Sequence, residues 1–194
     1  MAENDWFRNS DWSPAIETRF FENLRRARRK GQYLLVQAGH LEQSRPEVAL
    51  TLLERYFQLG KGFDLAQAFV VQARAYLSLG NVAKALKSYE SALEREHEYP
   101  TLRTCAGLEL SMLVANHQIA DQYAAALALL VQYKARIAFP VEEFQYYAAR
   151  ALISKEQGDS RRARKYALGA LRAAEREHSG FLLPLKIGPG RKSV

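Results

Sequence analysis

Apolar residues recur at helical spacing along most of the chain, in segments that end at turn residues. The clearest segment, residues 66–96, predicts two amphipathic helices around Gly80-Asn81. Gly80 can adopt the left-handed conformation that ends a helix, and Asn81 can cap the helix that follows. Ala73 and Ala85 are small enough to let the two backbones approach closely. This segment is therefore expected to fold as a helix hairpin.

The same pattern recurs along the chain, which indicates an internal repeat. Each predicted second helix carries an alanine at an equivalent position: Ala49, Ala85, Ala126 and Ala163. Each predicted first helix has a bulky residue near its start: Tyr33, Phe69, Leu110 and Tyr147. Gly158-Asp159 repeats the Gly80-Asn81 turn, and a wider step between the second and third units predicts a longer turn around 115–121. Four helix pairs are expected over residues 31–178.

Residues 1–30 form a separate region in this prediction, an aromatic segment followed by a ninth helix. Ser13 is a suitable N-cap with Pro14 at the first helical position, and apolar residues then follow at Ile16, Phe20, Leu24 and Ala27. This helix is expected to cover the first repeat, because the end of a helical array must be shielded from water. The aromatic residues Trp6, Phe7 and Trp12 either pack there or form a contact site for a partner.

Three further local signals shape the prediction. Ser44 and Glu47 have the spacing of a capping box at the start of a helix. Pro100 and Pro140 are each expected to open the next first helix. Residues 179–194 are rich in Gly and Pro and predict an extended tail, and its apolar residues suggest that part of it folds back.

The hairpin at 66–99 resembles a tetratricopeptide repeat. The family pattern of small, aromatic, Gly, Ala, aromatic and Ala is met by Ala73, Tyr76, Gly80, Ala85, Tyr89 and Ala92. In the other three units His40, His117 and Ser154 stand where Tyr76 stands. The resemblance covers about residues 31–178 and is to small bacterial proteins of this family without a recognised enzyme activity. It implies an all-α fold, an α-solenoid of about four helix pairs with the N-terminal helix as a cap.

The resemblance also implies a concave groove lined by the first helix of each pair. The family register places these partner-binding candidates in the groove: Leu34, Leu41, Val70, Arg74, Leu77, Ser111 and Leu152. Members that hold the carboxylate termini of chaperones use Lys and Asn in this lining, whereas apolar residues such as Leu34 and Val71 stand here. A helix or apolar peptide is therefore one expected occupant. The other is the chain's own tail or N-terminal segment.

The net charge of +7 is concentrated at the ends of the chain. Residues 155–194 carry 10 basic and 4 acidic groups, a net +6, whereas residues 31–154 carry 11 and 12, a net −1. The last predicted helix supplies the basic-face candidates: Arg161, Arg162, Arg164, Lys165 and Arg172. A smaller cluster is Arg25, Arg26, Arg28, Arg29 and Lys30. The basic face is a solvated surface or a site for an acidic protein. Nucleic acid is the least favoured partner, because helical spacing places the only interleaved aromatic, Tyr166, on the buried stripe.

The sequence offers no arrangement typical of catalysis. The four histidines lack metal-site spacing, and His40 and His117 occupy equivalent positions that suggest a packing role. The single cysteine, Cys105, is expected to be a buried apolar filler. We therefore expect no enzyme activity, no cofactor and no metal. The N-terminus lacks the pattern of a secretory signal and no apolar run is long enough to span a membrane, which predicts a cytoplasmic protein without a membrane partner.

These patterns favour a non-enzymatic module that binds a protein or peptide partner through the concave groove or the basic terminal face. The alternative is an immunity protein that neutralises a bacterial toxin through a large charged surface. Nucleic-acid binding through the last helix is the weaker alternative. The sequence leaves open the partner's identity, the oligomeric state and the choice between groove and basic face.

Overall fold

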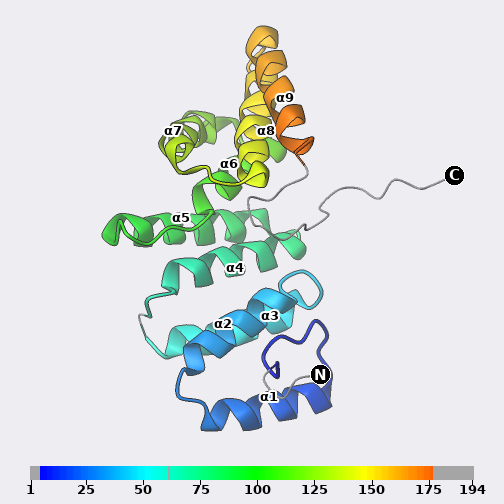
Figure 1. Ribbon diagram of the computed structural model, residues 1–194, viewed down its shortest axis with the longest axis vertical. Coiled ribbons are helices and arrows are strands. Elements are labelled where there is room, and N and C mark those ends of the chain that lie inside the picture. The colour runs from blue at the N-terminus through cyan, green and yellow to red at the C-terminus, as the bar shows by residue number, and fades with distance from the viewer. Residues whose placement is uncertain (1–4, 61, 177–194) are drawn as a thin grey trace, which may run out of the picture. The chain divides into compact units, whose positions relative to one another are not determined.

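The structure is a computed structural model that describes residues 5–60 and 62–176. This part of the chain contains nine α-helices and no β-strand, which confirms the all-α prediction (Figure 1). The chain divides into two compact units at Ala106 and Gly107. No boundary falls at residue 30, because the first helix shares a core with the helices that follow it. The boundary expected at residue 178 lies outside the described residues. The predicted tail, 179–194, lies outside the described residues.

The N-terminal unit contains one leading helix and two helix hairpins. Helix α1 (Pro14–Arg26) precedes the pair α2 (Lys30–Leu41) and α3 (Pro46–Gln58), and the pair α4 (Leu65–Ser78) and α5 (Val82–Glu98) follows. The core joins α1 to both hairpins through side chains that are at most 8% exposed. Its members include Phe20, Leu24, Leu34, Leu41, Leu52, Leu53, Tyr56 and Val71.

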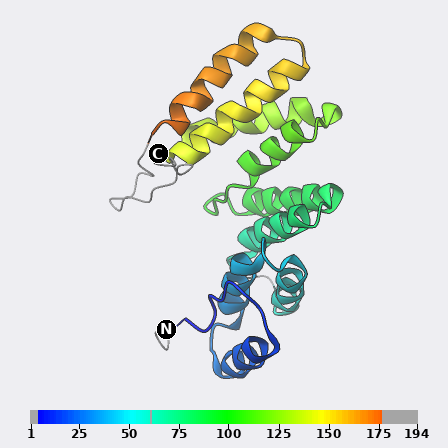
Figure 2. The same ribbon diagram turned by 90° about the vertical axis from the view of Figure 1, so that its right-hand side faces the viewer.

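The C-terminal unit contains one further hairpin, preceded by two helices. Helix α6 (Ala106–Asn116) contacts α7 (Tyr123–Tyr133), since the buried hydroxyl of Ser111 lies within hydrogen-bond distance of two carbonyl oxygens, that of Gly107 in its own helix at 2.7 Å and that of Ala126 in α7 at 3.2 Å. Helix α8 (Pro140–Glu156) pairs with α9 (Ser160–Ala174), and the two lie side by side along their length (Figure 2). Short 3-10 turns at Ala120–Gln122 and Lys134–Arg136 flank α7.

The local helix signals that rest on backbone geometry are confirmed. Ser13 caps α1 by accepting a hydrogen bond from the Ile16 amide. Gly80 has φ +71° and Gly158 has φ +78°, and the side chains of the next residues, Asn81 and Asp159, cap α5 and α9. The longer turn between α6 and α7 is present at residues 117–119, and Pro140 opens α8.

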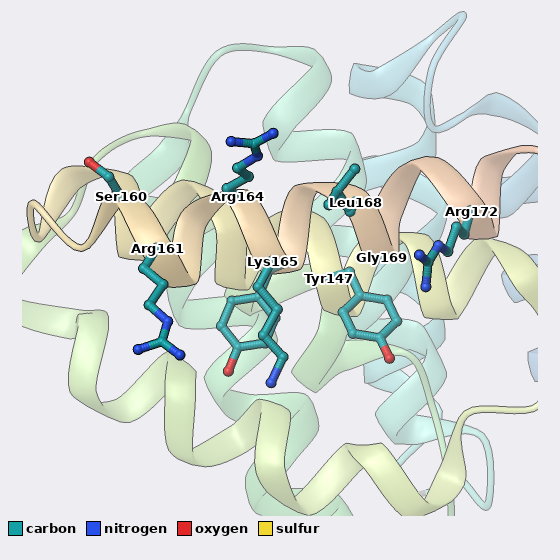
Figure 3. Close-up of a pocket in the computed structure, with 9 residues that line it drawn as sticks. Tyr147, Ser160, Arg161, Arg164, Lys165, Leu168, Gly169 and Arg172 are labelled. Atoms are coloured by element: carbon teal, nitrogen blue, oxygen red, sulfur yellow. The ribbon is translucent and has the colours of Figure 1, made fainter.

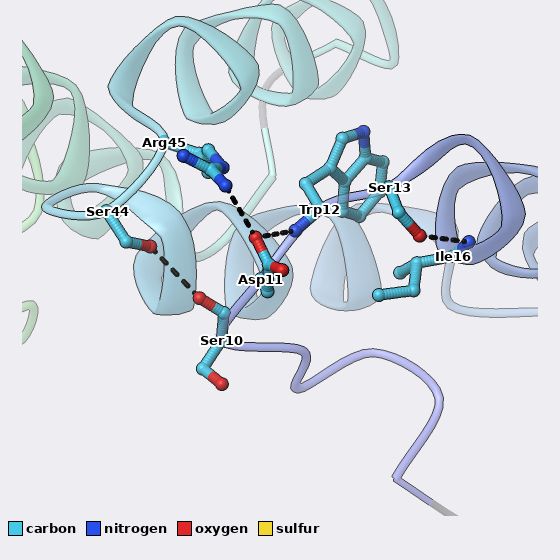
Figure 4. Close-up of polar contacts among 7 residues, drawn as sticks. All are labelled: Ser10, Asp11, Trp12, Ser13, Ile16, Ser44 and Arg45. Carbon is cyan, nitrogen blue, oxygen red and sulfur yellow. Dashed lines mark hydrogen bonds and ion pairs between the residues drawn. The ribbon is translucent and has the colours of Figure 1, made fainter.

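Two local predictions are wrong. Ser44 does not cap α3, because its hydroxyl donates instead to the carbonyl oxygen of Ser10 at 3.1 Å (Figure 4). Pro100 does not open a helix, since α6 begins only at Ala106. In the first case a contact with a distant segment replaces the local cap.

The aromatic N-terminal segment packs on the core of its unit, as one of its two interpretations predicted. Trp6 lies with its ring centroid 5.3 Å from that of Phe20 and 4.8 Å from that of Tyr33. Trp12 packs edge-on against Phe20 at 5.5 Å. The packing interpretation is confirmed, because these rings are half-buried against buried residues rather than presented to solvent.

Polar contacts fix the same segment to α2 and α3. The side chain of Gln37 is fully buried, and it accepts hydrogen bonds from the Asn9 backbone and side-chain amides and donates one to the Asn9 carbonyl. Asp11 forms an ion pair with Arg45 at 2.9 Å (Figure 4). The Trp12 backbone amide and the Arg45 guanidinium lower the pKa of the Asp11 carboxyl below its ordinary value. Gln37 is thus the buried anchor of residues 5–13.

We expect Gln37→Ala to release this segment from the core. The loss leaves three polar atoms of Asn9 without their partner, which costs about 1–3 kcal/mol of unfolding free energy. Trp6 and Trp12 are the chain's two tryptophans, so tryptophan emission reports on this segment alone and should shift to the red. Gln32→Ala, at an exposed position of the same helix, is the control and should leave the emission unchanged. Unchanged emission in both variants would show that Gln37 does not hold the segment.

Candidate functional site

Helix α9 lies against α8 through a stripe of small residues. Ala170 and Ala173 are buried, and Ala163 and Gly169 are half-buried. Their spacing places them on one face of the helix. Because the small residues occupy the face toward α8, the long cationic side chains of α9 lie on its remaining surface.

The closest approach of the two helices involves Gly169. The ring of Tyr147, from α8, packs directly on the α9 backbone at this position (Figure 3). A Cβ atom at residue 169 would lie 2.8 Å from the Cγ and Cδ1 atoms of that ring. Glycine in a helix interior costs about 1 kcal/mol relative to alanine, so its presence here has a packing reason. Gly169 provides the space in which the Tyr147 ring lies at the edge of α9.

Arg150 of α8 contacts two of the tyrosines between the two helices. Arg150 donates hydrogen bonds to the hydroxyls of Tyr146 and Tyr166, both at 2.8 Å. Its guanidinium also lies over the Tyr166 ring, 4.6 Å from the centroid. The rings of Tyr147 and Tyr166 stack with their centroids 6.4 Å apart. Both rings are therefore fixed by contacts with their neighbours.

A cleft of about 720 Å³ opens along α9 beside these tyrosines. Its lining combines four cationic side chains with apolar and aromatic surface (Figure 3). The lining residues are Tyr147, Ser160, Arg161, Arg164, Lys165, Tyr166, Leu168, Gly169 and Arg172. Leu168 is 48% exposed although it lies between charged residues. The cleft thus offers an apolar contact surrounded by positive charge.

The four cationic side chains of the cleft can each pair with a ligand. Arg161, Arg164, Lys165 and Arg172 are exposed, and none of them forms an ion pair with another described residue. By contrast, Arg162 pairs with Asp159 at 3.3 Å and does not line the cleft. Four uncompensated cations along about three turns of helix create a local positive potential that attracts an acidic ligand.

The structure therefore brings together four of the five predicted basic-face residues and leaves Arg162 outside. It also adds residues that the sequence analysis did not assign to a site, above all Tyr147 and Leu168. Tyr166 is half-buried, as its spacing predicted, but it also lines the cleft. The signal that could have found Tyr147 is Gly169, since a glycine inside a strongly helical segment indicates a close approach.

The predicted groove lining is not brought together as an accessible surface. Leu34, Leu41, Val70 and Ser111 are at most 2% exposed, so their side chains are not available to a partner. Leu34 and Leu41 belong to the core that α1 and the aromatic segment complete. The structure corrects this part of the prediction for these four residues.

The other three groove candidates, Arg74, Leu77 and Leu152, are half-buried. Arg74 forms an ion pair with Glu42 at 3.4 Å, and its Nη2 lies 3.2 Å from the Cys105 sulfur. Cys105 is accordingly half-buried and polar in its contacts, not the fully buried filler that was expected.

Two predictions about histidine are also wrong. His40 and His117 are exposed, so neither has the packing role that their equivalent repeat positions suggested.

Within residues 5–60 and 62–176, no three His, Cys, Asp or Glu side chains are grouped as a metal site. None of the helices described there combines the length and apolar character that a membrane-spanning helix needs.

Comparison of the chain with protein-family models, with curated proteins and with solved structures finds no match.

We expect Gly169→Ala to destabilise the protein, against the usual effect of this substitution in a helix. The new methyl group would displace the Tyr147 ring, and overpacking of this kind costs about 1–3 kcal/mol. Gly39→Ala in α2 is the control, because its Cβ would meet only Val71 at 3.9 Å. There the better helix propensity of alanine should leave stability unchanged or raise it by up to about 1 kcal/mol. Urea unfolding followed by circular dichroism measures both. Equal effects of the two substitutions would contradict the close approach at Gly169.

Proposed function

We propose that this chain is a non-enzymatic protein-binding module, built from tetratricopeptide-like helix hairpins, that captures an acidic segment of a partner protein on α9. The observation that carries the proposal is the cleft itself. Four cations without an ion-pair partner among the described residues surround an exposed leucine. Helix hairpins in both units support the family assignment.

The lining favours a protein ligand whose contact face is both acidic and apolar. Leu168 and the neighbouring Leu171 are 48% and 59% exposed, and apolar side chains of this size gain stability when a partner covers them. The surrounding Arg and Lys side chains match carboxylates in charge and hydrogen bonding. An amphipathic helix with Glu or Asp beside Leu meets both requirements.

The same residues disfavour single-stranded nucleic acid. Sequence-tolerant binding of this kind needs aromatic faces on which bases can stack. Here the Tyr147 ring packs on Gly169, and the Tyr166 ring is covered by Arg150 and stacked with Tyr147. The two rings that line the basic cleft are therefore already in contact with neighbouring groups, which disfavours base stacking on them.

A neutralising protein for a bacterial toxin is the second candidate. This function requires a charged outer surface instead of a groove, and the burial of Leu34, Leu41, Val70 and Ser111 favours the outer surface. It differs from the first candidate in kinetics, since an immunity protein should associate rapidly and with strong salt dependence.

We expect charge reversal in the cleft to abolish capture of an acidic peptide. The probe is a fluorescent amphipathic peptide of about 15 residues, or about four helical turns, with Glu and Leu on one face. The triple variant Arg161→Glu, Arg164→Glu and Arg172→Glu should weaken binding at least about 100-fold, because like charges then face each other. Fluorescence anisotropy measures the affinity, and circular dichroism checks that the variant is folded.

Two controls locate the effect. Arg162→Glu reverses another exposed charge of the same helix outside the cleft, and should change affinity by less than about threefold, the scale of a peripheral charge. Leu77→Glu tests the groove and should also leave binding intact. If Arg162→Glu and the triple variant lose the same affinity for the peptide, the effect is one of net charge and not of the cleft. Tighter binding of a single-stranded oligonucleotide than of the peptide would overturn the protein-ligand assignment.

A further inference from the structure

A second charged cleft, of opposite sign, lies on the outer face of α5. It has a volume of about 630 Å³ and is lined by Glu90, Leu93, Glu94, His97 and Glu98. All of these except the half-buried Leu93 are exposed. The opposite face of α5 is buried through Ala85, Tyr89 and Ala92. The helix is thus held by its apolar face and presents three glutamates to solvent.

Most of this negative charge is not neutralised by ion pairs with other described residues. Glu90 and Glu94 form no ion pair with another described residue. Glu98 pairs with Arg95 at 2.8 Å, but its side chain remains 57% exposed and can accept a further donor. The acidic face is therefore available to a cationic surface.

The acidic face of α5 and the basic face of α9 are opposite in charge and similar in length. Glu90, Glu94 and Glu98 follow each other at one-turn intervals and span about 12 Å of helix, at 1.5 Å per residue. The cations from Arg161 to Arg172 span about 16.5 Å by the same rise. Each face also carries one leucine among its charges, Leu93 on α5 and Leu168 on α9. Two such helices can pack leucine to leucine with opposite charges on both sides.

We propose that the chain self-associates by docking the basic face of α9 in one copy on the acidic face of α5 in a second copy. The inference rests on the proposed function, because it assigns the second copy's α5 as an occupant of the same α9 cleft. Each chain carries both faces, so contacts are either reciprocal within a pair or continue head to tail along a row. An acidic partner protein competes with the second copy for α9 and dissociates the assembly.

The net charge of +7 does not prevent such an association at physiological salt. Repulsion between exposed charges is screened over about 8 Å at 0.15 M ionic strength, whereas the two faces meet in direct contact. Higher salt should weaken the assembly, since the contact is largely electrostatic. A purely apolar association would instead persist.

A charge-swap experiment tests the pairing. Sedimentation velocity over about 10 μM to about 1 mM covers the range expected for a small charged interface. The wild-type chain should associate with increasing concentration, and Arg164→Glu or Glu94→Arg should each weaken the association about tenfold or more. The double variant, and a 1:1 mixture of the two single variants, should regain association, because each then places a glutamate opposite an arginine. Glu54→Arg, at an exposed position of α3, is the control and should have no effect.

The outcomes separate this inference from the proposed function. A wild-type chain that stays monomeric at every concentration overturns the inference of self-association. This includes the case in which α5 and α9 of one chain pair with each other. Association that survives Glu94→Arg, or that the charge swap does not restore, also overturns it. The acidic peptide is measured in parallel on the wild-type chain and on Glu94→Arg. If the wild-type chain binds the peptide but does not self-associate, only the contact with a second copy is refuted. If the wild-type chain neither binds the peptide nor self-associates, the α9 site is refuted as well.

Discussion

The contact between Tyr147 and Gly169 is the constraint on which the functional surface depends. A tyrosine ring on a glycine backbone brings α8 and α9 together at one fixed rotation of α9 about its axis. The small residues then face α8, and the cations of the cleft lie on the outer surface of α9. Asp159 caps α9 and fixes where it begins, while Arg150 of α8 donates a hydrogen bond to Tyr166 of α9. The basic cleft is a consequence of this packing.

In both units the helices bury apolar residues in a core, and α5 and α9 each keep one face exposed to solvent. In α5 and α9 the solvent faces are charged, acidic in the first and basic in the second. Several charges on these two faces, Glu90 and Glu94 on α5 and the four cations of the cleft on α9, have no ion-pair partner among the described residues. The two faces therefore connect the fold to both proposals, capture of an acidic partner and association with a second copy.

Much of the fold could be predicted from the sequence, because its signals are local. Gly80-Asn81 and Gly158-Asp159 combine a left-handed glycine with a capping side chain, and this chemistry acts within a few residues. The candidate site was predicted only in part, since it depends on contacts between distant residues. Tyr147 meets Gly169 from another helix, and Leu34 is buried by the core that includes α1. The sequence predicts α1 itself, but a groove register taken from a repeat family does not show which side chains of the first hairpin α1 covers. Ser44 shows the same limit, because its hydroxyl bonds to Ser10 instead of the nearby helix end.

Hydrogen–deuterium exchange of the full chain with and without the acidic amphipathic peptide tests the central claim most directly, because it shows which helices the ligand covers. The account predicts slower exchange in α9 and in the part of α8 around Tyr147, with no change in α4 or α6, whose residues Val70 and Ser111 were candidates for a groove. Protection of α4 and α6 with α9 unchanged would contradict it.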